Sequence, residues 1–254
     1  MKNISALRLL FFIAFLSLIL VMLPRHNAPV ASDGSATFVT SWGSDVISNG
    51  NLKLAQGIAV DTTGNIFVAD TRNHRIQKFD STGTFLATWG TFGTDNGLFN
   101  LPTDVGVDSL GFVYVADSGN NRIQKFTTTG TFVTAWGTVG SLINQFVTPS
   151  GLAVDPSNRV VVADTGNNRV QVFSANGGFL NTWGSPGTGN SQFSDPLGIA
   201  TDAAGNVYVA DTGNNRVQKF TSAGSFVVAW DNSGILNGQF FAPSAVDTDA
   251  FGNV

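Results

Sequence analysis

The chain has 254 residues, of which 43% are hydrophobic and 12% are charged, so it is long enough to fold around a substantial core. It contains no cysteine, which excludes disulfides, thiolate metal sites and cysteine nucleophiles. The formal net charge is −4, and all seventeen acidic residues are aspartates. Because nucleic-acid binding normally needs a basic surface, we expect no nucleic-acid partner for this acidic chain.

The first expected element is an N-terminal leader. Basic residues precede an unbroken apolar run from Leu9 to Leu23, in the order typical of a secretory signal. The run of fifteen residues is shorter than the ~20 that a membrane-spanning helix needs. Since Pro29-Val30-Ala31 is an imperfect cleavage site, an uncleaved membrane anchor stays open as the alternative.

This leader sets the expected domains and localisation. We expect a signal peptide or N-terminal membrane anchor at residues 1–31, a linker at 32–37 and one repeat domain at 38–254. The repeat domain is then extracytoplasmic, either secreted or periplasmic, or held at a membrane through the N-terminal segment alone.

From residue 38 onward the sequence repeats with a period of 47 residues, and repeats of this length are typical of propellers, solenoids or arrays. Positions that keep this period include Trp42, Trp89, Trp136, Trp183 and Trp230, and also Phe79, Phe126, Phe173 and Phe220. The fourth repeat predicts strands at 198–202, 206–211, 216–220 and 225–230, with short turns rich in glycine and asparagine between them. Such a meander buries both faces only by stacking against copies of itself, so we interpret the recurring aromatic residues as core.

A family resemblance rests on the second and third strands of each repeat. An Ala-Asp pair ends the second strand, a turn with asparagines follows, and Arg and Gln lead the third strand; the first copy holds Asn73-His74-Arg75. With the Trp-Gly pair that ends most repeats, this pattern resembles the NHL repeat over residues 38 to 254. The resemblance implies an all-β fold, a β-propeller of four-stranded antiparallel blades that usually number six.

The ends of the repeat domain complete this picture. Phe38 to Trp42 has the pattern of a lone fourth strand, of the kind that completes the last blade in such propellers. The fifth repeat stops at Val254, inside its expected second strand. An open ring leaves an unpaired edge, which folded proteins avoid. We therefore expect four complete blades plus a partial fifth, as a fragment of a six-bladed ring.

One end of the propeller collects the turns between the second and third strands together with the long connections between repeats. We call this end the loop end, and it contains residues 71–74 and their equivalents with the connections at 91–103, 138–150, 185–197 and 232–244. Binding residues concentrate on loops that a rigid scaffold holds in place. We expect the ligand face at the loop end.

An aspartate and an arginine flank the turn at this end in every repeat. Because the pair recurs in each blade, we interpret it as structural, with the Asp capping the turn backbone and the Arg bracing across it. The pairs are Asp70 and Arg75, Asp117 and Arg122, Asp164 and Arg169, and Asp211 and Arg216. A calcium ion held by the ring of aspartates is the alternative, but no clustered Asp spacing accompanies it, so we expect no metal and no cofactor.

Residues that depart from the repeat are the better candidates for binding, since structure explains the shared ones. The polar departures are Arg72 and His74 in the first repeat, Asp104 at the start of an innermost strand, and Asp247 facing the channel. Apolar loop residues that vary between repeats complete the candidate contact set: Phe92, Leu142, Ile143, Ile235 and Leu236. Neutral drift of surface positions is the competing explanation for each of them.

Near-identical blades with variable loops favour an exported scaffold that binds a protein, peptide or glycan through its loop end. The alternative is an enzyme, because propellers that resemble this chain include metal-dependent lyases and lactonases with a metal in the channel. Such sites generally use clustered His or Glu residues, and here one His lies outside the leader. We therefore favour a non-enzymatic role, unless ligands come from further blades. A purely structural surface component is the third interpretation.

Overall fold

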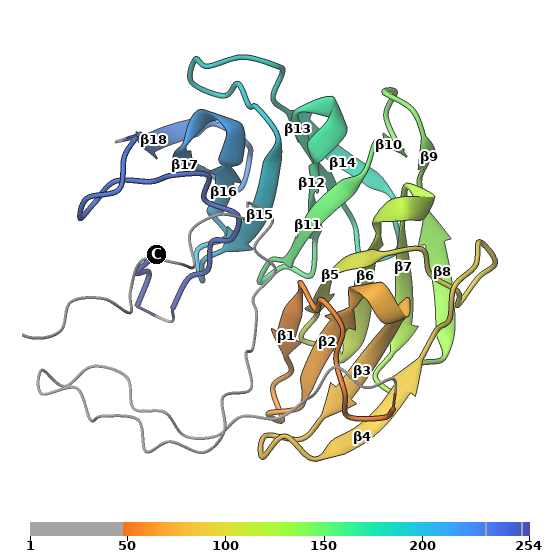
Figure 1. Ribbon diagram of the computed structural model, residues 1–254. Coiled ribbons are helices and arrows are strands. Elements are labelled where there is room, and N and C mark those ends of the chain that lie inside the picture. The colour runs from red at the N-terminus through yellow and green to blue at the C-terminus, as the bar shows by residue number, and fades with distance from the viewer. Residues whose placement is uncertain (1–47, 232, 250) are drawn as a thin grey trace, which may run out of the picture.

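The computed structural model describes residues 48–231, 233–249 and 251–254 and contains four sheets of four antiparallel strands each. The leader, the linker and the expected strand from Phe38 to Trp42 lie outside the described residues. The four blades follow one another around a common centre in chain order (Figure 1). The first blade comprises β1 (Ile58–Val60), β2 (Ile66–Asp70), β3 (Arg75–Phe79) and β4 (Phe85–Trp89). The second comprises β5 (Pro102–Val107), β6 (Phe112–Asp117), β7 (Arg122–Thr127) and β8 (Phe132–Trp136).

The third and fourth blades repeat this arrangement. The third comprises β11 (Pro149–Val154), β12 (Val160–Asp164), β13 (Arg169–Phe173) and β14 (Phe179–Trp183). The fourth comprises β15 (Pro196–Thr201), β16 (Val207–Asp211), β17 (Arg216–Phe220) and β18 (Phe226–Trp230), which confirms the four strands expected there to within two residues at each end. A small parallel pair, β9 (Thr138–Val139) with β10 (Gln145–Phe146), lies in the connection between the second and third blades. No helix of the described residues is long and apolar enough to cross a membrane.

The turn between the second and third strands of each blade is a short 3-10 helix. These are η1 (Thr71–Asn73), η2 (Ser118–Asn120), η3 (Thr165–Asn167) and η4 (Thr212–Asn214). The residue that ends each one is left-handed, with φ of 53° or 54° at His74, Asn121, Asn168 and Asn215. Asparagine tolerates this conformation better than most residues, which explains why it recurs there.

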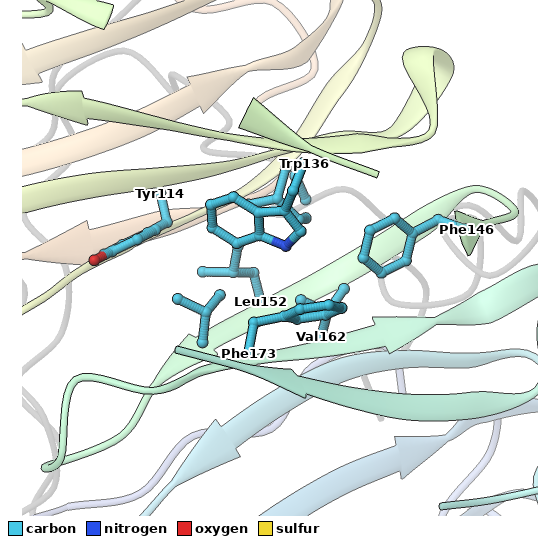
Figure 2. Packing of buried hydrophobic residues seen from close by; sticks show 9 residues of the cluster. Tyr114, Trp136, Phe146, Leu152, Val162 and Phe173 are labelled. Atoms are coloured by element: carbon cyan, nitrogen blue, oxygen red, sulfur yellow. The ribbon is translucent and has the colours of Figure 1, made fainter. Parts of the chain in front are cut away.

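The hydrophobic core consists of the layers between neighbouring blades. Between the second and third blades, Trp136 packs against Phe173 with ring centroids 5.8 Å apart and against Tyr114 at 6.3 Å (Figure 2). The Trp136 ring also lies against Gly177, where φ is 83° and an added Cβ would come within 2.7 Å of the indole. The third-strand phenylalanines at 79, 126, 173 and 220 are all at most 1% exposed, so the assignment of these recurring aromatic residues to the core is confirmed.

Polar contacts join the blades near the axis. Thr165 at the start of η3 donates its hydroxyl to the carbonyl of Pro196 in the next blade at 2.6 Å, and Thr212 donates likewise to Pro243 at 2.8 Å. Thr248 in turn donates to the carbonyl of Thr201 at 3.0 Å. Residues 243–249 therefore lie beside β15, in the place of a next inner strand. They form no strand in the structure.

The blade-to-blade layer predicts a large effect of losing its indole. Trp136→Ala should lower the free energy of unfolding by about 3–5 kcal/mol, since it leaves a cavity between two blades. Chemical denaturation measures this loss. Trp230→Ala is the matched control: Trp230 is 39% exposed whereas Trp136 is 9% exposed, so the control should cost much less. Equal losses in both variants would contradict the interblade role.

Candidate functional site

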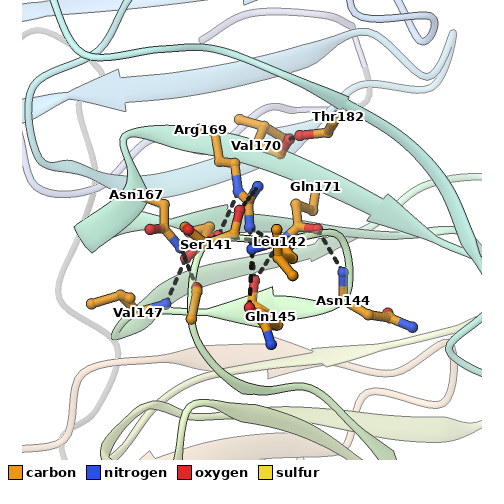
Figure 3. Close-up of polar contacts among 12 residues, drawn as sticks. Ser141, Leu142, Asn144, Gln145, Val147, Asn167, Arg169, Val170, Gln171 and Thr182 are labelled. Carbon is orange, nitrogen blue, oxygen red and sulfur yellow. Dashed lines mark hydrogen bonds and ion pairs between the residues drawn. The ribbon is translucent and has the colours of Figure 1, made fainter.

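Each connection that leads into one of the four blades is held by a buried polar network of that blade, and Figure 3 shows the network of the third blade. In the third blade, Asp164 accepts hydrogen bonds from the backbone N–H of Val147 at 2.9 Å and from Arg169 Nε at 2.7 Å. The Arg169 guanidinium also donates to three carbonyls of the connection, those of Ser141 at 2.7 Å, Leu142 at 2.8 Å and Gln145 at 2.9 Å. The connection is thereby fixed through its backbone.

Two amide side chains complete the network. Gln171 Nε2 donates to Asp164 Oδ2 at 3.1 Å and to the Gln145 carbonyl at 2.8 Å, while Asn167 donates to Asp164 and to the carbonyl of Gly140. The other three blades repeat the ion pair between Asp Oδ2 and Arg Nε at 2.6–2.7 Å. All four Asp side chains are 0% exposed, so each carboxylate depends on its partners for the hydration it has lost.

The expected capping role of these aspartates is wrong. Asp70, Asp117, Asp164 and Asp211 precede the 3-10 turns, but none makes a side-chain hydrogen bond that caps the turn backbone. Their backbone partner is instead the N–H seventeen residues upstream, in the incoming connection. The Asp–Arg ion pair is present in each blade, where it fixes the connection to the sheet.

The connection at 138–148 presents apolar side chains on this fixed backbone. Leu142 is 70% exposed, Ile143 is 57% exposed and Val139 is 68% exposed. The same segment carries the parallel β9–β10 pair, and Gln145 Oε1 accepts the backbone N–H of Leu142 at 3.1 Å. These side chains are therefore exposed on a loop whose backbone carbonyls are hydrogen-bonded to Arg169 of the third blade.

Three candidate residues of the first repeat meet at one place on the loop end. His74 Nδ1 accepts the backbone N–H of Leu101 at 3.0 Å, and its ring meets Phe92 edge-on with centroids 5.1 Å apart. Burial lowers the pKa of His74, and the nearby charge of Arg72 lowers it further. In the other blades an asparagine oxygen accepts the equivalent N–H at 2.8 Å, so His74 retains this structural contact.

A fourth residue at this place was missed by the sequence analysis. The backbone carbonyl of Lys53 accepts the N–H of Arg72 at 3.1 Å, and the Lys53 N–H donates to Asp70 at 2.7 Å. Both side chains are exposed. Lys53 stands where the later repeats have Asn100, Val147, Ser194 and Phe241, so it departs from no shared residue, unlike Arg72, which replaces a recurring glycine.

Asp104 lies between blades near the axis. One carboxylate oxygen accepts the backbone N–H of Leu152 in β11 at 2.7 Å and the other accepts that of Val105 at 2.9 Å. Burial raises the pKa of Asp104 to about 7. The equivalent glycine at 151 leaves no room for a side chain, because an added Cβ would lie 2.1 Å from the Leu197 carbonyl oxygen. The structure thus gives Asp104 a contact between inner strands.

The remaining candidates lie apart from this group. Ile235 and Leu236 are 89% and 70% exposed on the connection at 233–242, and Asp247 is exposed and accepts the N–H of Thr248. A hollow of about 340 Å³ opens at the opposite end of the channel and includes Asp61, Asp108, Asp155, Asp202 and Asp249, but not Asp247. Among the described residues, no three His or acidic side chains are placed to hold a metal ion.

The network makes a clear stability prediction. Arg169→Met leaves the buried charge of Asp164 without its partner and should lower the free energy of unfolding by about 3–5 kcal/mol in denaturant titrations. Arg72→Gly removes an exposed cation from the same end and should change stability by less than about 0.5 kcal/mol. A similar loss of unfolding free energy in both variants would contradict the role of the network in holding the connection.

Asp104 predicts a pH dependence of stability. Its pKa near 7 in the folded state exceeds the ordinary value of 3.8, so the folded state holds this proton more tightly than the unfolded state does. The contribution of Asp104 to stability is therefore greatest below pH 4 and falls as pH rises to about 7, by on the order of a few kcal/mol. Melting curves of wild type and Asp104→Asn should differ in slope over this window. Parallel pH profiles would refute the assignment.

The comparisons with known proteins agree with this geometry. The family model described as NHL repeat matches residues 52–79, 99–126, 146–173 and 193–220. Each match begins in a connection and ends with the third strand that holds it. None of the curated proteins matches the sequence.

Solved structures share the fold at low sequence identity. A structure of the nidogen/laminin complex matches with a TM-score of 0.60 and 18% identity over 79% of this chain and 70% of the other. Selenomethionine-substituted virginiamycin B lyase from Staphylococcus aureus matches with a TM-score of 0.57 and 15% identity over 78% of this chain and 61% of the other. A catalytically inactive variant of that lyase, solved with quinupristin, has a TM-score of 0.54 and 17% identity, over 68% and 54%.

The chain thus spans from about half to 70% of the length of these proteins, and at such identities the likeness concerns the fold alone. The family follows from the four repeat matches, which span residues 52 to 220 and coincide with the four blades. This chain belongs to the NHL-repeat family and folds as an NHL-repeat β-propeller.

Proposed function

We propose that this protein is an exported binding scaffold that engages a partner protein through its loop end. The observation that carries the proposal is the pair Leu142 and Ile143, which is exposed on a connection whose backbone is fixed by Arg169 and Asp164. A preorganised loop loses little conformational entropy on binding, so its apolar side chains contribute more of their burial energy to affinity. An exposed apolar pair without this support would be an ordinary surface feature.

The other support is less specific. A propeller of the same fold occurs in the nidogen/laminin complex, which is a protein–protein assembly. Export rests on the leader at residues 1–31, where basic residues precede the apolar run from Leu9 to Leu23. No specific observation on the described residues favours the alternative of a metal-dependent lyase or lactonase.

Site-specific photo-crosslinking tests this proposal. A photoreactive amino acid at position 142 should crosslink to a partner protein in extracts of the source organism, because Leu142 lies on the loop end. The matched control is position 110, which is 72% exposed against 70% at 142 but lies in a turn at the opposite end. The crosslinked protein should be absent with the probe at 110.

A second variant links the crosslink to the apolar pair. With the photoreactive residue at Val139, Leu142→Gly with Ile143→Asn, which copies Gly189 and Asn190 of the next connection, should remove the crosslink while the melting temperature stays unchanged. Equal crosslinking from 142 and 110, or an undiminished crosslink in the double variant, would refute binding through this loop.

A further inference from the structure

The positive side chains of the described residues are almost all engaged within the fold. Eight of the ten lysines and arginines contact a carboxylate, a carbonyl or an aromatic ring: Arg75, Lys78, Arg122, Lys125, Arg159, Arg169, Arg216 and Lys219. The side chains of Lys53 and Arg72 make no such contact with the described residues. Among the described residues of this acidic protein, the two cations without such a contact therefore lie in the first repeat, Lys53 in the segment before β1 and Arg72 in η1.

The backbones of these two residues are adjacent. The Arg72 N–H donates to the Lys53 carbonyl at 3.1 Å, and the Lys53 N–H donates to buried Asp70 at 2.7 Å. The polar network of the first blade thus fixes both backbones, with Arg75 donating to the carbonyls of Ser48 and Asn51. The positive pair lies on an ordered part of the loop end.

Arg72 fits into the turn, but its guanidinium makes no hydrogen bond or ion pair with the described residues. In the later blades the equivalent residue is glycine, and a Cβ on Gly119 would lie 2.6 Å from the Asn100 carbonyl oxygen. The equivalent backbone hydrogen bonds there are 2.8–2.9 Å long, against 3.1 Å at Arg72, so the connection stands slightly further away in the first blade. The close approach of the connection explains why the later blades have glycine at this position. No hydrogen bond or ion pair among the described residues explains why the first blade has arginine.

His74 and Phe92 extend this cluster with a donor and an apolar surface. Because His74 Nδ1 accepts a backbone N–H, the neutral ring carries its proton on Nε2, and the lowered pKa keeps that neutral form dominant near pH 7. Phe92 is 69% exposed beside this ring. Arg72 acts electrostatically on His74, and the His74 ring contacts Phe92, so an exposed cation, an N–H donor and an aromatic face occur together. Lys53 adds a second cation on the segment whose backbone is bonded to Arg72.

We infer that Lys53, Arg72, His74 and Phe92 form a recognition site for a short acidic and apolar peptide segment of the partner protein. Arginine binds carboxylates in a fork geometry, and arginine and aromatic residues are enriched where protein interfaces are tightest. A polyanion such as a sulfated glycan draws its affinity from many cations at once, whereas this site offers two within an acidic domain. The inference rests on the proposed function and names the partner's chemistry at the same loop end.

The probe is a terminally blocked octapeptide that alternates leucine and glutamate, compared with its twin in which glutamine replaces every glutamate. Titration calorimetry on the full chain should show binding of the acidic peptide that weakens with salt, and at least tenfold weaker binding of the twin. The double variant Lys53→Asn with Arg72→Gly copies Asn100 and Gly119 of the second blade, so its fold should be intact. It should lose about tenfold in affinity for the acidic peptide.

The matched control is Lys219→Gln, which removes one positive charge from β17 and should leave the peptide affinity within about twofold. Equal binding of the two peptides, or unchanged binding by the double variant, would overturn the inference. So would binding of a heparin hexasaccharide in place of the acidic peptide. The crosslink at position 142 is measured separately, so its presence without peptide binding would leave the proposed function standing while this inference fails.

Discussion

The buried ion pair between an aspartate at the end of the second strand and an arginine at the start of the third strand organises every described blade. A carboxylate with no exposed surface has lost its hydration, and it persists because arginine, glutamine, asparagine and a backbone N–H replace the lost water. The same arginine reaches three carbonyls of the connection. The conformation of the loop end is therefore set from inside the sheet.

With this arrangement, the backbone conformation of a connection does not depend on the identity of its outward side chains. The network contacts backbone carbonyls, which every residue has, and one N–H, which every residue except proline has, so the outward side chains can differ. The connection at 138–148 carries Leu142 and Ile143, whereas the following one carries Gly189 and Asn190 at the same positions. A protein built in this way can present distinct chemistry from each blade while the blades themselves remain nearly identical.

The sequence was sufficient to predict the blades, because the 47-residue period, the strand patterns and the recurring phenylalanines all arise from one packing requirement. It was insufficient to predict that Asp164 binds the backbone N–H of Val147, since a backbone group leaves no trace in the pattern of side chains. Asp104 illustrates the same limit: its pKa is raised by burial, which depends on how the blades pack and not on the residues next to it in the chain. Lys53 was missed for another reason, because its significance depends on eight of the ten lysines and arginines of the described residues being engaged.

Each connection that leads into a described blade is held by hydrogen bonds from that blade. A connection and the blade that follows it therefore form one structural unit. Arg122, Asp117 and Gln124 hold the segment that precedes their blade, and the fourth strand of that blade takes no part in the network. A cassette for loop exchange should therefore start after one fourth strand and end before the next connection. A graft that moves a blade together with the connection that follows it would separate that connection from the residues that hold its backbone. This would hold even if the graft began and ended at the boundaries of the sheet.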